Sequence, residues 1–339
     1  PPPENQPTLA SQMSPLRLAQ VAVAAAANMG ANAEAQAFLS GERRALEARL
    51  TPAAARGPCL LLGAHLGQLC LEAGDLDGAR DLLQAGLAAF QELDLPEPSV
   101  AAELYWLAAQ VHKHRRAFGE FFRAALLYLC YVPVDSLAPA ARLSLAVDVS
   151  LAALLAPEVH SFGELLTHPI VGALESEAGN GPHLGYGWLL RLLRAVGGGD
   201  LAGFRAVLEE HASEVGLQPA LLEARGMLER KAGTAAIVRH VVKAHAEGSK
   251  ERLALAEVAG KTGLSEKAVH ELLAQAFAGK LLEGTIDQVA GTLQVTWVKP
   301  RVLTFEEIAE ARGKLGIWGG KAAECLDLVG QYEAYGLVQ

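Results

Sequence analysis

The stretch that decides the fold runs from Gly263 to Val298 and reads GLSEKAVHELLAQAFAGKLLEGTIDQVAGTLQVTWV. Ser265 stands directly before Glu266–Gly279, and a serine there predicts a helix start because its hydroxyl can accept from free backbone amides. Leu293–Val298 alternates and is rich in β-branched and aromatic residues, so it predicts a strand that pairs with LLEGTID across a glycine-containing turn. With a short amphipathic helix expected over 249–262, these elements predict a winged helix at residues 249–301.

The chain before the winged helix is expected to be helical throughout. Ser14-Pro15 and Thr51-Pro52 each combine an N-cap residue with proline at the first helical position. Ala and Leu supply much of the apolar content, and β-branched residues are sparse until the last quarter. Helices of roughly 15–20 residues joined by short turns are typical of stacked helical hairpins. We expect a helical-repeat arm over 1–117 and a second helical region over 118–248, in a mainly α fold.

One further helix is expected after the winged helix, in residues 302–339. Thr304-Phe305-Glu306-Glu307 has the form of a capping box, and Leu303 with Ile308 can form its hydrophobic staple. Small or apolar residues then recur at alternating spacings of three and four: Ile308, Ala311, Leu315, Trp318, Ala322, Cys325 and Val329. This heptad seam predicts packing against partner helices, in a bundle with other chains.

Composition excludes several classes of protein. The 339 residues are 51% hydrophobic, which argues against disorder, and the net charge of -9 argues against a general nucleic-acid binder. The four cysteines (Cys59, Cys70, Cys130 and Cys325) are scattered, so neither a disulfide framework nor a zinc site is expected. No membrane span is expected, because no stretch is long and apolar enough, and no signal peptide is expected, because no basic segment stands at the start of the sequence.

The winged helix itself is not expected to bind DNA. Residues 249–301 contain seven basic side chains (Lys250, Arg252, Lys261, Lys267, Lys280, Lys299 and Arg301) against six acidic ones. Phosphate contact needs a clear excess of cations. The strand Leu293–Val298 is instead expected to bind a partner, because an unpaired strand edge can accept a neighbouring strand. Val295 and Trp297 can equally fill the core of the wing, and alternation allows both roles.

Three other clusters are interpreted as structural. His160, Glu164 and His168 have metal-like spacing, but Ser161 as N-cap would put His160 outside the helix, so no metal site is expected. Gly197-Gly198-Gly199-Asp200 lacks the lysine and hydroxyl residue of a phosphate-binding loop and predicts a linker. The basic turn from His112 to Arg116 is interpreted as a solvated face, with docking of an acidic neighbour as the alternative.

Two passages resemble a known family. The first passage is Phe162-Gly163-Glu164-Leu165-Leu166-Thr167-His168-Pro169. The second is Gly284-Thr285-Ile286-Asp287-Gln288-Val289, followed by Val295-Thr296-Trp297-Val298-Lys299-Pro300-Arg301-Val302-Leu303. Both are similar to segments of the proteasome non-ATPase regulatory subunit 13 family. That family has a PCI domain, the module shared by proteasome lid, COP9 signalosome and initiation factor three subunits. The likeness extends over about Tyr105 to Leu303, whereas residues 1–100 match in helical character alone.

The resemblance implies a scaffold subunit of the 26S proteasome lid that has no catalytic residues, no cofactor and no metal. It implies other PCI lid subunits, the lid deubiquitinase pair and a ubiquitin receptor as partners, in cytoplasm and nucleus, with neither nucleic acid nor membrane as a ligand. Partner contacts are expected at Leu293, Val295, Trp297, Ile308, Leu315, Trp318 and Val329. The alternatives are a PCI subunit of another assembly (COP9 signalosome, initiation factor or mRNA export) and a hydrolase using the His160–His168 cluster.

Overall fold

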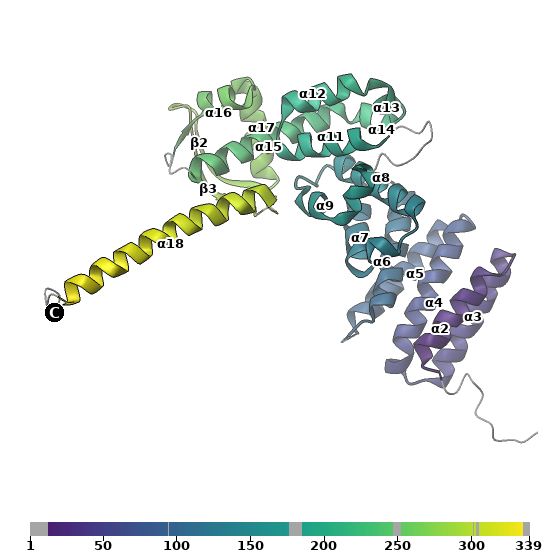
Figure 1. Cartoon of the computed structure of the whole chain (residues 1–339). Coiled ribbons are helices and arrows are strands. Elements are labelled where there is room, and N and C mark those ends of the chain that lie inside the picture. The colour runs from purple at the N-terminus through teal and green to yellow at the C-terminus, as the bar shows by residue number, and fades with distance from the viewer. Residues whose placement is uncertain are drawn as a thin grey trace, which may run out of the picture. The chain divides into compact units, whose positions relative to one another are not determined.

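The computed structural model describes residues 13–93, 95–175, 185–246, 252–300, 302 and 305–334. These residues are mainly helical, with a small antiparallel sheet in the last third of the chain (Figure 1). Their internal contacts divide them into two units. Unit 1 contains the described residues of 1–159, 169–196 and 201–231, and unit 2 contains those of 160–168, 197–200 and 232–339.

Unit 1 begins with long helices that each pack against the next one in the chain, as the sequence predicts. They are α2 (Pro15–Ala27), α3 (Asn32–Arg49), α4 (Pro52–Glu72), α5 (Leu76–Gln91), α6 (Pro98–His114), α7 (Phe118–Tyr131) and α8 (Pro139–Leu155). Shorter helices follow: α10 (Gly172–Glu175), α11 (Gly187–Gly198), α12 (Leu201–Glu210), α13 (Ala212–Gly216) and α14 (Pro219–Glu223). Unit 1 also contains two 3-10 turns, η1 (Val134–Ser136) and η2 (Pro169–Val171). Helix α15 (Arg225–Ala246) extends from unit 1 into unit 2, as do the last two residues of α11.

Small side chains allow the first helices to pack closely. Ala19, Ala22 and Ala26 recur at spacings of three and four on one face of α2, and all three are buried. Because alanine keeps the interaxial distance short, α2 packs against both α3 and α4. Ser14 caps α2, with its hydroxyl accepting from the Arg17 amide at 3.4 Å. The helical-repeat arm predicted from the sequence is confirmed.

Unit 2 contains the winged helix that the sequence predicts. The winged helix consists of β1 (Leu253–Ala254), α16 (Leu255–Thr262), α17 (Glu266–Ala278), β2 (Leu282–Asp287) and β3 (Thr292–Val298). Unit 2 also contains α9 (Gly163–Thr167) and α18 (Phe305–Ala334). The sheet has the order β1-β3-β2 and is antiparallel. The core lies between this sheet and helices α15, α16 and α17, with Val258, Val269, Leu273, Leu282 and Leu293 among its buried members.

Local signals explain the turns of the winged helix. Gly263 ends α16 in the left-handed conformation, at φ 68°, and the Ser265 hydroxyl accepts from the Ala268 amide at 3.3 Å. In the wing, Asp287 Oδ1 accepts from the amides of Val289 at 3.0 Å and Ala290 at 2.9 Å. This side-chain turn, followed by Gly291 at φ 62°, reverses the chain between β2 and β3.

Several local expectations were wrong. Helix α16 begins at Leu255, because Leu253 and Ala254 pair with β3 as strand β1. Ser161 does not cap α9, whose N-cap is the buried Phe162. Gly197 and Gly198 belong to α11, and Gly199 alone turns the chain, at φ 69°.

The capping box and staple at Leu303 and Thr304, and the residues 247–251, lie outside the described residues. The domain boundaries expected after residues 117, 248 and 301 stay predictions.

Candidate interaction surfaces

Strand β3 places its three predicted contact residues in two different environments. Leu293 is fully buried and Val295 is 9% exposed, and both belong to the winged-helix core. Trp297 is 42% exposed. Leu293 and Val295 can therefore offer a partner only their backbone, whereas Trp297 can offer its indole ring.

A β-bulge explains why Trp297 faces outward. Gly284 pairs with Val295 and Glu283 pairs with Trp297, so Thr296 is the extra residue of β3. The extra residue breaks the alternation that would have put Trp297 in the core beside Val295. Gly284 is required here, because a Cβ would lie 2.2 Å from the carbonyl oxygen of Gln294.

The edge of β3 is partly open. Strand β1 pairs with β3 at Thr292 and Leu293, whereas β2 pairs with β3 from Thr292 to Val298. Within the described ladder, Gln294–Val298 is thus paired on one side. Among the described strands, this segment and the outer edge of β2 are places where another strand could add.

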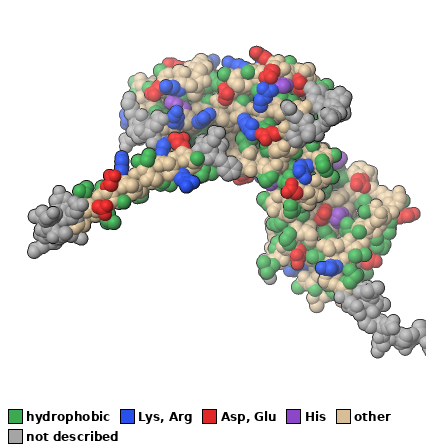
Figure 2. Space-filling model, viewed as in Figure 1, with side chains coloured by type: hydrophobic (Ala, Val, Ile, Leu, Met, Phe, Trp, Pro, Cys, Tyr) green, Lys and Arg blue, Asp and Glu red, His purple; other side chains and the backbone are tan. Residues whose placement is uncertain are grey.

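Helix α18 exposes large apolar side chains along its length. The exposed fractions are 48% for Ile308, 67% for Leu315, 69% for Trp318 and 52% for Val329, all predicted contact residues. Every residue described from 308 to 330 is exposed. Figure 2 shows hydrophobic side chains along this helix between the charged ones. An apolar face of this extent is typical of a surface that binds another protein.

The apolar surface of α18 is wider than the predicted seam. Ile317 is 66% exposed and Leu328 is 53% exposed. Each directly precedes a seam residue, Trp318 or Val329, and therefore points about 100° away from it. The helix is apolar on more than one side, which is typical of a helix surrounded by several others.

The two passages that carry the family resemblance lie against each other within unit 2. A Cβ on Gly163 would be 2.7 Å from Val302 Cβ and 2.8 Å from the Val302 carbonyl oxygen. Phe162 is buried beside Gly197, where a Cβ would be 2.9 Å from the Phe162 ring. Segment 160–168 is therefore a packing element. Among the described residues, no group of three or more His, Cys, Asp or Glu side chains could hold a metal ion.

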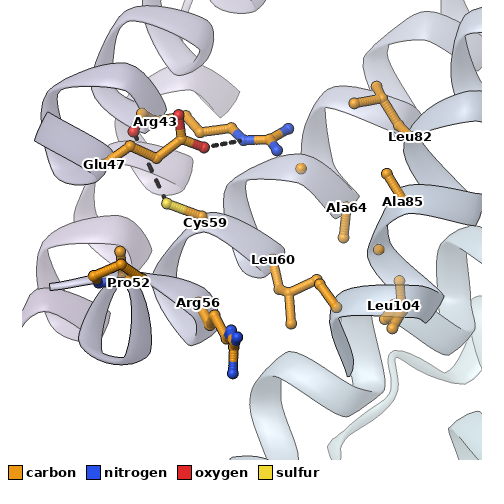
Figure 3. A pocket seen from close by; sticks show the side chains of 14 residues that line it. Arg43, Glu47, Pro52, Arg56, Cys59, Leu60, Ala64, Leu82, Ala85 and Leu104 are labelled. Carbon is orange, nitrogen blue, oxygen red and sulfur yellow. Dashed lines mark hydrogen bonds and ion pairs between the residues drawn. The ribbon is translucent and has the colours of Figure 1, made fainter. Parts of the chain in front are cut away.

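An apolar pocket of about 370 Å³ lies in unit 1 between α3, α4 and α5 (Figure 3). Leu60, Ala64 and Leu82 are among its lining residues. Charged groups at its rim are already paired: Arg43 Nε lies 3.1 Å from Glu47 Oε1, and Arg56 Nη2 lies 2.7 Å from Glu92 Oε2.

Cys59 also lines this pocket, and its Sγ lies 3.9 Å from the Arg43 carbonyl oxygen. Burial raises the pKa of this thiol, so it stays protonated and is a poor nucleophile.

A helical-repeat arm followed by a winged helix and a terminal helix is the architecture of a PCI-domain protein. The family model for PSD13 N-terminal repeats matches residues 7–193, and the model for the PCI domain matches residues 208–297. The chain belongs to the family of 26S proteasome non-ATPase regulatory subunit 13.

Named relatives support this membership. The chain is 34% identical to 26S proteasome non-ATPase regulatory subunit 13 homolog B of Arabidopsis thaliana over 306 residues, which cover 90% of this chain and 77% of the relative. It is 28% identical to the 26S proteasome regulatory subunit RPN9 of Saccharomyces cerevisiae, over 76% of this chain and 63% of the relative. It is 25% identical to 26S proteasome non-ATPase regulatory subunit 13 of Dictyostelium discoideum, over 80% of this chain and 69% of the relative.

Among the described residues, no helix combines the length and the apolar character needed to span a bilayer.

Proposed function

We propose that this chain is a non-catalytic scaffold subunit in the lid of the 19S regulatory particle of the 26S proteasome. It supports ubiquitin-dependent protein degradation by holding other subunits in place, and it works in cytoplasm and nucleus. Its neighbours are other PCI subunits of the lid, with the deubiquitinase pair and a ubiquitin receptor nearby. Membership of the subunit 13 family supports this proposal.

The observation that most favours a scaffold is helix α18. Three of its large apolar side chains are about two thirds exposed or more: Leu315 at 67%, Trp318 at 69% and Leu326 at 73%. Large apolar side chains in water are costly, at about 25 cal/mol per Å² of apolar surface left exposed. A bundle with helices of other chains would bury them. The exposed Trp297 on the winged helix would add a second contact, since tryptophan is enriched among residues that dominate binding energy.

The experiment compares incorporation of variants into the lid. Tagged chains ending before Thr304 are expressed beside the full chain, and the lid is isolated by native gel and quantified. The shortened chain is expected to be lost from the lid. Unchanged incorporation would show that α18 has no bundle role.

Point variants separate the seam from the helix as a whole. Trp318→Glu places a carboxylate in the seam and is expected to reduce incorporation about as much as the truncation does. Ala309→Glu adds the same charge to an exposed position outside the seam and is the matched control. Equal effects of the two variants would contradict a specific apolar contact.

A further inference from the structure

A half-buried carboxylate on α6 has no cationic partner among the residues that the structure describes. Glu103 Oε2 accepts from Gln68 Nε2 at 3.1 Å and lies 3.5 Å from His65 Nε2, both on α4. The Glu103 side chain is 34% exposed. In the part of the chain that the structure describes, no lysine or arginine pairs with Glu103 and its Oε1 has no hydrogen-bond partner. Buried or partly buried carboxylates are usually paired, so this one has acceptor capacity left over.

The neighbouring histidine does not neutralise Glu103. Burial lowers the pKa of His65, and the Glu103 charge raises it by less. The imidazole is therefore uncharged at neutral pH. Gln68 and His65 fix the orientation of the carboxylate through Oε2 while leaving its negative charge in place.

Two aromatic rings border this carboxylate. Trp106 follows Glu103 by three residues on α6, which puts both on the same helix face. The Tyr128 ring on α7 lies 5.0 Å from the Trp106 ring, centroid to centroid, at 40°. Burial raises the pKa of Tyr128 and the Glu103 charge raises it further, so Tyr128 lies within the field of that carboxylate. Both rings are half-buried and keep part of their surface open to solvent.

We propose that Glu103, Trp106 and Tyr128 form a binding site for an arginine side chain on a basic segment of a partner protein. A carboxylate beside aromatic faces is the arrangement that attracts organic cations. Arginine fits better than lysine, because its planar guanidinium stacks on an aromatic ring while donating hydrogen bonds to a carboxylate. The free Oε1 of Glu103 supplies the acceptor, and the uncompensated charge supplies the attraction.

This site lies wholly in unit 1, so it can be tested without the assembly contacts proposed above. The probe is the peptide acetyl-Gly-Arg-Gly-amide, titrated into the full chain labelled with ¹⁵N at tryptophan. The Trp106 indole signal is assigned by its loss in Trp106→Phe. The arginine peptide is expected to shift this signal saturably. A peptide with citrulline, the neutral isostere of arginine, is expected to bind at least about tenfold more weakly because no charge-assisted bond can form.

Variants separate the carboxylate from general charge effects. Glu103→Gln keeps an acceptor for Gln68 and is expected to weaken the arginine peptide at least about tenfold. Glu42→Gln removes the same charge from an exposed position on α3 and is expected to leave binding unchanged. Thermal unfolding of both variants should match that of the parent chain, which confirms that the fold is intact.

Three outcomes would overturn the proposal. The Trp106 signal could stay in place when the arginine peptide is added. Glu103→Gln could bind the peptide as tightly as the parent chain does. The citrulline peptide could bind as well as the arginine peptide, which would make Glu103 merely an acceptor that joins α4 to α6.

Discussion

Substituting Lys231 tests whether a buried charge ties α15 to α8. Lys231 is 5% exposed, and its Nζ donates to the carbonyl oxygens of Ala153 at 3.1 Å, Leu154 at 2.9 Å and Ala156. These carbonyls stand at the C-terminal end of α8, where no further helix amides are available to them. The ammonium group thus serves as a cap for a buried helix end.

The cost of burying this charge sets how strongly the free energy of unfolding depends on pH. Burial lowers the pKa of Lys231 from 10.5 to about 8. Below pH 8 both the folded and the unfolded chain hold the proton, so stability does not change with pH through this group. Between pH 8 and 10.5 the unfolded chain binds more protons than the fold, so stability rises by about 1.4 kcal/mol per pH unit. From pH 8 to 9.5 this amounts to about 2 kcal/mol, which is lost again as the pH falls back through 8.

The assay is urea unfolding, followed by circular dichroism at pH 7.5 and pH 9.5. The parent chain is compared with Lys231→Arg, whose guanidinium stays charged at both values. Cysteines and tyrosines titrate in both proteins, so their contributions cancel in the difference. The parent chain is expected to gain about 2 kcal/mol more than the variant on going to pH 9.5. An equal gain in both proteins would mean that Lys231 keeps its proton up to pH 9.5, which would contradict a pKa lowered by burial.

Two pairs of substitutions test the packing of unit 2. Gly199→Ala should lower the melting temperature by several degrees, because Gly199 has φ 69° and an added Cβ would lie 2.3 Å from the Ala236 backbone nitrogen. Gly198→Ala should be nearly neutral, because the nearest atom to an added Cβ there is Arg239 Nη1 at 3.9 Å. Similar melting temperatures for the two variants would contradict this. Leu293→Ala should cost about 2–5 kcal/mol in urea unfolding, because Leu293 is fully buried. Trp297→Ala should cost much less, and an equal loss would show that the tryptophan packs in the core.

The winged helix could be predicted because its signals are local. Ser265 caps the helix that follows it, and a glycine-containing turn separates two runs with strand character. Each of these depends on residues within a few positions of one another. The seam of α18 could be listed for the same reason, since a heptad pattern is visible in sequence alone.

What the sequence did not predict depends on contacts between distant residues. Strand β1 has two residues and takes its form from pairing with Leu293. The bulge at Thr296 determines that Trp297 is exposed, and strict alternation would have buried it. Phe162 replaces Ser161 as the N-cap of α9 because its ring packs beside Gly197. The Glu103 site depends on the meeting of three helices, α4, α6 and α7.

The most direct test of the scaffold proposal is native affinity purification of the tagged full chain, with its partners identified and quantified by mass spectrometry. A scaffold subunit of the lid should recover the lid subunits together with the ATPase ring, and should lose them when the chain ends before Thr304. Recovery of a different PCI assembly, or of RNA in their place, would keep the fold and contradict the proposed function.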